Sequence, residues 1–433
     1  MAEFLLVDRA MRLFEESSGC KMHRDPTAGK CKFLALGRWR GTLTQEDLPC
    51  NFFSLSDHLD MLGVTLKATY TSTRKANGDD LQDKIKNMVG PWRAGKHMPL
   101  TMRPFSLNSY AFPKLWHKCN TIDLRVGDIN TINKLAKSWL YADLLEKPEE
   151  LALYRQPADG GLGLHHVQLR ALAYQISCFL ETSCNPVYRR NQYHEALFLF
   201  HVLGEDIPEP DIPPFFKGEF FPTLRRLNAT PLSLSKVSLK EIYRFLIEEI
   251  TILDEEPDTR TLKPLRTELA NPATPWDIVW PSSRQHKLGP SLCSFLFKLL
   301  HQILPTAERV ARILPNQSQY CTRCQLETTE TLQHALFDCP ANQGVGTVLQ
   351  NGLRKYLPNL TTKMIITLNY PIEEELQFPI VWTTATFLST LWHLRIEKKR
   401  VDLIKIRAEM EANCRLLRGS RLAKTTEMIS QIF

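Results

Sequence analysis

The sequence predicts a mostly α-helical protein with a small mixed α/β segment at its N-terminal end. Apolar residues recur at helical spacing from about Leu81 onward, and the alternating runs typical of strands fall within the first 70 residues. Hydrophobic residues make up 43% and charged residues 23% of the 433 positions, which is ordinary for a folded protein with a sizeable core. At about 150 residues per domain, this length allows roughly two to four domains.

The first 70 residues are expected to form one helix and two strands. Apolar residues recur at helical spacing from Phe4 to Phe14, and Gly19 would end that helix. The run CKFLALGRW, which starts at Cys31, is typical of a strand. The alternating run LGVTL, which starts at Leu62, predicts a second strand with its apolar side chains on one face.

Beyond this segment the pattern is helical, with one interruption. A proline-rich interval between Ile207 and Pro231 contains four phenylalanines, which favour an ordered loop packed on the body. Helical periodicity returns in SLKEIYRFLIEEI and SLCSFLFKLLHQIL. The uncharged run FPIVWTTATFLSTLWHL contains Pro, Thr, Ser and His, so it predicts a buried helix rather than a membrane span. The remainder is expected to end in one long basic helix.

Composition also constrains the compartment. The N-terminus lacks the basic and long apolar regions of a signal peptide, so the protein is expected inside the cell, in the nucleus or cytoplasm, and not secreted. Eleven cysteines in a reducing compartment indicate metal binding more often than disulfides. The net charge of +7 permits a nucleic-acid partner without requiring one.

The stretch YCTRCQLETTETLQHALFDC contains three cysteines and one histidine at the spacing C-x2-C-x9-H-x4-C. These residues are Cys321, Cys324, His334 and Cys339. Thiolates and imidazole suit Zn²⁺, and four of them fill a tetrahedral shell with no position left for water or substrate. We therefore expect a structural Zn²⁺ site rather than a catalytic one.

The residues before this cluster add a family resemblance. WDIVW is followed by an apolar helix ending LLHQILPTAERVAR and then by CTRC…ET…H…C, an order that resembles the zinc-binding region after the reverse transcriptase domain of LINE-type, non-LTR retrotransposon proteins. The matching positions are Trp276, Trp280, Leu304, Pro305, Thr306, Arg309, Cys321, Cys324, Glu327, Thr328, His334 and Cys339.

Upstream segments extend the resemblance and imply five parts. FEESSGCKMHRDPTAGKCKFLALGRW resembles the end of a palm, MLGVTL a primer-grip strand, MPLTMRPFSLNSYAFPKLWHKC a thumb segment, and LYRQPADGGLGLHHV the segment after it. The implied parts are a palm remnant (1–70), a helical thumb (71–150), a helical connector with the proline-rich loop (151–275), a zinc module (276–345) and a helical basic tail (346–433). The family role implies binding of RNA or an RNA–DNA hybrid, and possibly DNA, with no membrane involved.

The resemblance assigns none of the family's catalytic residues to this chain. Polymerases of this family hold two metal ions with carboxylates, two of them from a Tyr-x-Asp-Asp turn, and the chain is expected to begin downstream of it. The nearest similar stretch, Tyr141-Ala142-Asp143-Leu144, has one Asp in a helical context. GGLGL (160–164) lacks the Gly-Lys-Ser/Thr end of a phosphate loop and is expected to be a turn into the next helix.

Basic residues are the candidates for nucleic-acid contact. From Leu391 to Lys424 ten Lys and Arg stand against four Asp and Glu, which suits either phosphate binding or a solvated helix face. In the palm- and thumb-like segments, basic residues lie near Trp39, Trp92 and Trp116, which favours phosphate and base contacts. The candidates are Arg38, Arg40, Lys96, Arg103, Lys114, Lys398, Lys399, Arg400 and Arg407.

The leading hypothesis is a non-catalytic C-terminal portion of such a protein that binds RNA or an RNA–DNA hybrid. Two alternatives remain open at this point. The chain could be a host-retained, element-derived protein whose zinc and tail regions bind another protein. It could also come from a truncated gene for an active RNA-directed DNA polymerase. The sequence does not indicate the oligomeric state.

Overall fold

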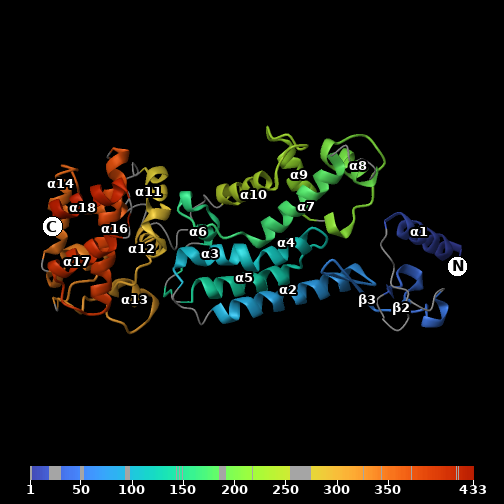
Figure 1. The fold of residues 1–433 in the computed structure, drawn as a ribbon, viewed down its shortest axis with the longest axis horizontal. Helices are drawn as coiled ribbons and strands as arrows, with labels where there is room; N and C mark the ends of the chain where they lie inside the picture. The colour runs from blue at the N-terminus through green and yellow to red at the C-terminus, as the bar shows by residue number, and fades with distance from the viewer. Residues whose placement is uncertain are drawn as a thin grey trace. The chain divides into compact units, whose positions relative to one another are not determined.

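The computed structural model is mostly helical, which confirms the predicted fold class (Figure 1). It describes residues 2–18, 31–48, 53–92, 98–142, 144–145, 147–148, 150–184, 192–216, 218–253, 275–324, 326–342, 344–371, 373–415, 417 and 419–433. Among these residues, no helix is both long enough and apolar enough to cross a membrane.

Eighteen α-helices and four short strands are formed by the described residues. The strands are β1 (Cys31–Phe33), β2 (Phe53–Leu55), β3 (His58–Met61) and β4 (Val64–Lys67). The helices before the metal-ligand cluster are α1 (Ala2–Ser18), α2 (Tyr70–Trp92), α3 (Arg103–Ser106), α4 (Pro113–Cys119), α5 (Val126–Leu140), α6 (Glu150–Tyr154), α7 (Val167–Cys184), α8 (Gln192–Phe198), α9 (Phe220–Asn228), α10 (Leu239–Leu253), α11 (Trp276–Ser283), α12 (Pro290–Leu300) and α13 (Ala307–Ile313). The helices after it are α14 (Val345–Arg354), α15 (Thr362–Thr367), α16 (Glu374–Ile396), α17 (Leu403–Cys414) and α18 (Ser420–Ile432).

The chain divides into two compact units, each built from several stretches of sequence. One unit comprises residues 1–88, 112–135 and 170–242, and the other comprises 89–111, 136–169 and 243–433. The five-part division expected from the sequence stays a prediction.

The first unit contains all four strands. β1 pairs with β2 in parallel, and β3 pairs with β4 as an antiparallel hairpin. The strands predicted at Cys31 and in LGVTL are therefore present, although both are short. Leu62 differs from the prediction, because it lies in the hairpin turn with a positive φ and is 84% exposed, whereas Val64 is buried.

Helices of the first unit pack through small and aromatic residues. A Cβ at Gly78 of α2 would lie 2.3 Å from the Asp128 carboxylate on α5, so only glycine allows this close approach. In the proline-rich interval, Phe216, Phe220 and Phe221 are buried and contact the Phe179 ring. The prediction of an ordered, packed interval is confirmed for these residues.

The core of the second unit surrounds α16. Every residue of this helix from Phe378 to Trp392 is buried, because α11, α12, α17 and α18 cover it. Figure 1 shows α14, α16, α17 and α18 gathered in the red end of the chain. The buried helix predicted from FPIVWTTATFLSTLWHL is thus confirmed.

The prediction of one long basic helix is wrong, because residues 391–424 belong to three separate helices, α16, α17 and α18. Lys398 adopts a left-handed conformation with φ 54°, which ends the α16 segment. Asp402 then caps α17 by accepting a hydrogen bond from the Ile404 amide, and Gly419 precedes α18 with φ 68°. Ile404 is 80% exposed, whereas Val401 is buried.

Candidate metal centre

Two of the predicted ligands lie at one end of a short hairpin in the second unit. The Cys321 amide donates to the Thr328 carbonyl at 2.9 Å, and the Glu330 amide donates to the Gln319 carbonyl at 2.9 Å. Cys321 directly precedes the turn formed by residues 322–324, and Cys324 lies within this turn. The C-x2-C spacing therefore places two thiols on one tight turn, as the sequence predicts.

The other two ligands lie at the two ends of a π-helical turn, η11 (His334–Asp338). His334 is its first residue, and Cys339 directly follows its last. Five residues along an α-helix rotate a side chain by roughly 500°, so residues i and i+5 would point about 140° apart. In the π-helical turn the Cys339 amide instead bonds the His334 carbonyl at 2.9 Å. This geometry brings Cys339 over His334 and explains how the H-x4-C spacing serves one site.

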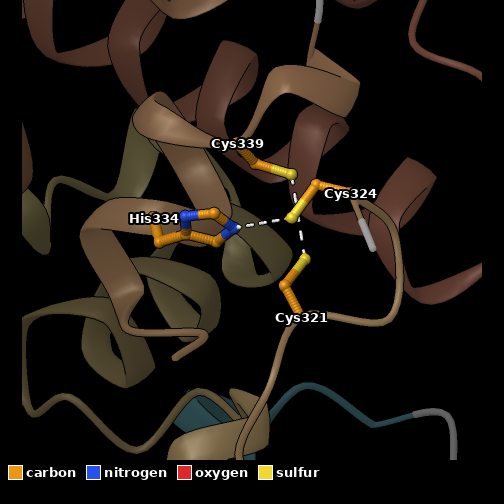
Figure 2. A group of neighbouring side chains, drawn as sticks. All are labelled: Cys321, Cys324, His334 and Cys339. Atoms are coloured by element: carbon orange, nitrogen blue, oxygen red, sulfur yellow. Dashed lines mark hydrogen bonds between the residues drawn. The ribbon is translucent and has the colours of Figure 1, made fainter. Parts of the chain in front are cut away.

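Figure 2 shows the four ligand side chains directed toward one another. Their ligand atoms all lie within 4.8 Å of one another. Cys321 Sγ is 3.8 Å from Cys339 Sγ, and Cys324 Sγ is 3.6 Å from His334 Nε2. Bonds of about 2.3 Å to sulfur and about 2.0 Å to nitrogen predict edges of roughly 3.8 and 3.6 Å in a tetrahedron. The sulfurs are also too far apart for a disulfide, which needs about 2.05 Å.

Most of the ligand side chains are buried. Cys321, His334 and Cys339 are buried, and Cys324 is half-buried. Burial, aided by the neighbouring Cys321 and Cys324 thiols and opposed by a backbone hydrogen bond from Ala341, raises the pKa of Cys339 to about 12. A metal ion would hold these thiols as thiolates, and four protein ligands leave it no open position for chemistry.

Asn342 connects the two halves of the site. Its side chain is fully buried, donates to the Ala335 carbonyl at 3.0 Å and accepts from Arg323 Nη1 at 2.8 Å. Its backbone amide bonds the Cys339 carbonyl at 2.9 Å. Because Arg323 lies between Cys321 and Cys324, this one amide side chain ties the C-x2-C turn to the π-helical turn.

Glu330 attaches the hairpin to the helices around it. Its carboxylate is 3% exposed, accepts from the Ala307 amide at 2.7 Å and forms a two-pronged ion pair with Arg395 of α16. The Arg395 guanidinium also lies 4.4 Å from the centre of the Trp392 ring. Sequence reasoning missed both residues, because 65 positions separate them and nothing local marks either as a partner.

The predicted nucleic-acid residues of the tail lie around the break between α16 and α17. Lys398, Lys399 and Arg400 are exposed, and Lys399 is paired with Glu397 at 2.7 Å. Arg407 is occupied, because its guanidinium bonds Glu411 at 2.8 Å and the Phe433 carbonyl at 3.1 Å. Three adjacent cations are thus exposed, and the Arg407 guanidinium is held by Glu411 and the Phe433 carbonyl.

Of the remaining candidates, the structure describes the side chains of Arg40, Lys114 and Arg103. Arg40 and Lys114 are exposed in the first unit. Arg103, in the second unit, is 3% exposed and donates to the Met98 and Leu140 carbonyls at 3.0 and 2.7 Å. This burial corrects its expected role as a phosphate contact. Lys96 and the side chain of Arg38 lie outside the described residues.

The three tryptophans expected beside these cations differ in exposure. Trp39 is 53% exposed, as a base-stacking residue would be. Trp116 is buried and stacks on Tyr174, with ring centres 5.8 Å apart. Trp92 is half-buried against Trp139, with ring centres 5.2 Å apart. Trp116 is therefore a packing residue, and Trp39 keeps a surface suited to stacking.

We expect the purified chain to contain one divalent metal ion, and Cys324→Ser to lower both the metal content and the melting temperature. Metal binding is coupled to folding at a site whose four ligands come from two local turns. Elemental analysis and thermal denaturation measure the two effects. Cys178→Ser is the matched control, because Cys178 is an exposed thiol on α7 outside the cluster. Loss of metal in both variants, or in neither, would contradict the assignment.

Glu330→Gln should destabilise the chain by about 3 kcal/mol, because it leaves the Arg395 charge buried without its partner. Urea denaturation measures this loss. The double variant Glu330→Gln/Arg395→Met removes both charges and should recover part of the stability, since the unpaired charge is gone. Strictly additive losses in the double variant would show that the two side chains act independently.

The comparisons with known proteins agree with this geometry. Residues 263–345 match a family described as zinc-binding in reverse transcriptase, and all four ligands fall within the matched range. No curated protein matches the chain. Over these residues the chain is similar to the zinc-binding region of reverse transcriptases, and the match together with the Cys3His group supports a reverse transcriptase-related protein with a metal-binding module.

Proposed function

We propose that this chain is a nucleic-acid-binding part of a LINE-type reverse transcriptase protein, built around one structural Zn²⁺. The observation that carries the proposal is the Cys3His group, whose ligand atoms lie within 4.8 Å of one another and which lies inside the range similar to reverse transcriptases. Three sulfurs and one imidazole nitrogen form a ligand set that suits Zn²⁺ better than Mg²⁺ or Ca²⁺, which prefer oxygen ligands.

The proposed ligand is RNA or an RNA–DNA hybrid, with DNA as a weaker ligand. The net charge of +7 and the exposed group Lys398, Lys399 and Arg400 support attraction to phosphates. Arg40, Lys114 and the exposed Trp39 offer further phosphate and base contacts in the first unit. Recognition of this kind depends on shape and charge rather than on sequence, and it implies a location in the nucleus or cytoplasm.

The chain's own contribution to reverse transcription is proposed to be binding and not nucleotide addition. The Tyr-x-Asp-Asp pattern does not occur in the sequence, and Tyr141-Ala142-Asp143-Leu144 supplies one Asp where two are required. Asp143 lies outside the described residues.

A protein-binding role is the second candidate, and exposed apolar side chains favour it. Ile313, Leu314, Tyr320 and Leu326, all within the metal-binding region, are between 38% and 61% exposed. Such residues on a small module are typical of a surface that another protein covers. The binding experiment below separates the two candidates.

The chain should bind structured RNA and an RNA–DNA hybrid with little sequence preference and with affinity that falls steeply as salt rises. Fluorescence anisotropy at several salt concentrations measures this. Lys399→Gln/Arg400→Gln should weaken binding of all sequences about equally and flatten the salt slope by about two units, since each phosphate contact contributes roughly one.

The matched control is Arg354→Gln/Lys355→Gln, which removes two adjacent exposed cations from the end of α14. It should leave the slope unchanged. If the unaltered chain binds no nucleic acid even at low salt, or binds equally at all salt concentrations, the protein-binding candidate replaces this proposal.

The purified 433-residue chain should not extend a primer on an RNA template with Mg²⁺ or Mn²⁺, because the paired carboxylates that hold two catalytic ions are missing. A labelled-primer assay tests this. Templated incorporation that disappears in Asp143→Ala would overturn the proposal and assign a catalytic role to the stretch around Tyr141.

A further inference from the structure

The GGLGL turn, which the metal site leaves unexplained, is fixed by close contacts within the second unit. Gly160 has φ 79°, and a Cβ there would lie 2.5 Å from the Trp280 ring. A Cβ at Gly161 would lie 1.9 Å from the Arg155 carbonyl oxygen. Both glycines are therefore required for the turn to fit between Trp280 and Arg155.

An aromatic stack and a histidine hold one side of this turn. Trp276 stacks on Trp280, and Trp280 stacks on His301, with ring centres 5.1 Å apart in each pair. His301 Nε2 donates to the Gly160 carbonyl at 2.8 Å. Burial, aided by the charges of Arg284 and Arg155, lowers the pKa of His301 to about 4, so the imidazole is neutral at physiological pH.

Arg284 holds the next residue of the turn. Its Nη2 donates to the Gly161 carbonyl at 2.8 Å, and its guanidinium carbon lies 4.8 Å from the centre of the Phe297 ring. Its Nε is buried with no hydrogen-bond partner. Arg155 belongs to the same turn, because its carbonyl accepts from the Gly163 amide at 2.9 Å.

Arg284 is a largely buried charge. Burial lowers the pKa of Arg284 to about 10, and the opposing influence comes from the Cys293 thiol rather than from an acid. Within the part of the chain that the structure describes, neither Arg155 nor Arg284 forms an ion pair. Because a desolvated guanidinium without a counter-charge is costly, an anion at this place would be stabilising.

Helix ends supply part of the missing negative charge. Arg155, Arg284 and His301 directly follow the C-terminal ends of α6, α11 and α12. Each such end carries at most about half a negative charge, and the effect falls off within one turn. These dipoles offset two guanidinium charges incompletely, since α6 is five residues long and α11 eight.

We infer that the GGLGL turn with Arg155 and Arg284 is a binding site for a phosphate-type oxyanion. The fork of a guanidinium matches the oxygens of a phosphate, and the charges of Arg155 on the turn and of Arg284 beside it both act on His301, which bonds the turn. The inference is independent of the metal centre and of the cations between α16 and α17, so it can fail while the proposed function stands.

Thermal denaturation of the full chain in inorganic phosphate, with chloride at equal ionic strength as the reference, tests the site. Phosphate should raise the melting temperature by about 2 °C or more beyond chloride, because a ligand that binds only the folded state stabilises it. Arg284→Gln and Arg155→Gln should each abolish this excess. In chloride alone, Arg284→Gln should melt no lower than the unaltered chain, since it removes an uncompensated charge.

Arg421→Gln is the matched control, because Arg421 also lies against a phenylalanine ring, 5.5 Å from Phe378, but stands on α18 away from the turn. It should keep the full phosphate effect. A phosphate effect equal to that of chloride, or one that persists in both Arg284→Gln and Arg155→Gln, would overturn the inference and make these arginines structural.

Competition distinguishes the source of the phosphate group. An unphosphorylated single-stranded oligonucleotide that reduces the phosphate effect would identify a site for the nucleic-acid backbone. Competition by a 5′-phosphorylated oligonucleotide but not by the unphosphorylated one would identify a site for a terminal phosphate. Either result supports an oxyanion site at the turn.

Discussion

The buried ion pair between Glu330 and Arg395 fixes the metal-binding hairpin to the central helix of the second unit. One carboxylate satisfies a guanidinium on α16 and the first amide of α13, so three elements meet at a single side chain. Glu330 follows directly on the hairpin that presents Cys321 and Cys324. A metal ion that orders this hairpin therefore also determines where Glu330 lies.

The ligand set could be predicted from the sequence because its geometry is local. Two cysteines at C-x2-C share a turn, and Asn342 and the π-helical turn bring His334 and Cys339 to them within a few residues. The helices were predictable for the same reason, because the spacing of apolar residues within a segment indicates whether that segment is helical. The sequence did not predict which residue each buried polar group would pair with.

Arg103 and the tail show where local patterns stop being informative. Arg103 is of a residue type that usually lies on the surface, but its guanidinium donates hydrogen bonds to two backbone carbonyls. One of these carbonyls lies 37 residues away in the sequence. In the tail, the left-handed Lys398 and the Asp402 cap separate α16 from α17, and Ile404 is exposed. Tertiary packing decides both outcomes, and the sequence of a single helix does not indicate how that helix will pack.

The complete burial of α16 has a consequence for how the chain folds during synthesis. α16 is buried on all sides from Phe378 to Trp392, and α17 and α18, which cover much of it, leave the ribosome after it does. Even the Phe433 ring contributes, since it stacks on Phe387. The apolar side chains of α16 therefore stay exposed until α18 has been synthesised, and this unit cannot complete its core before then.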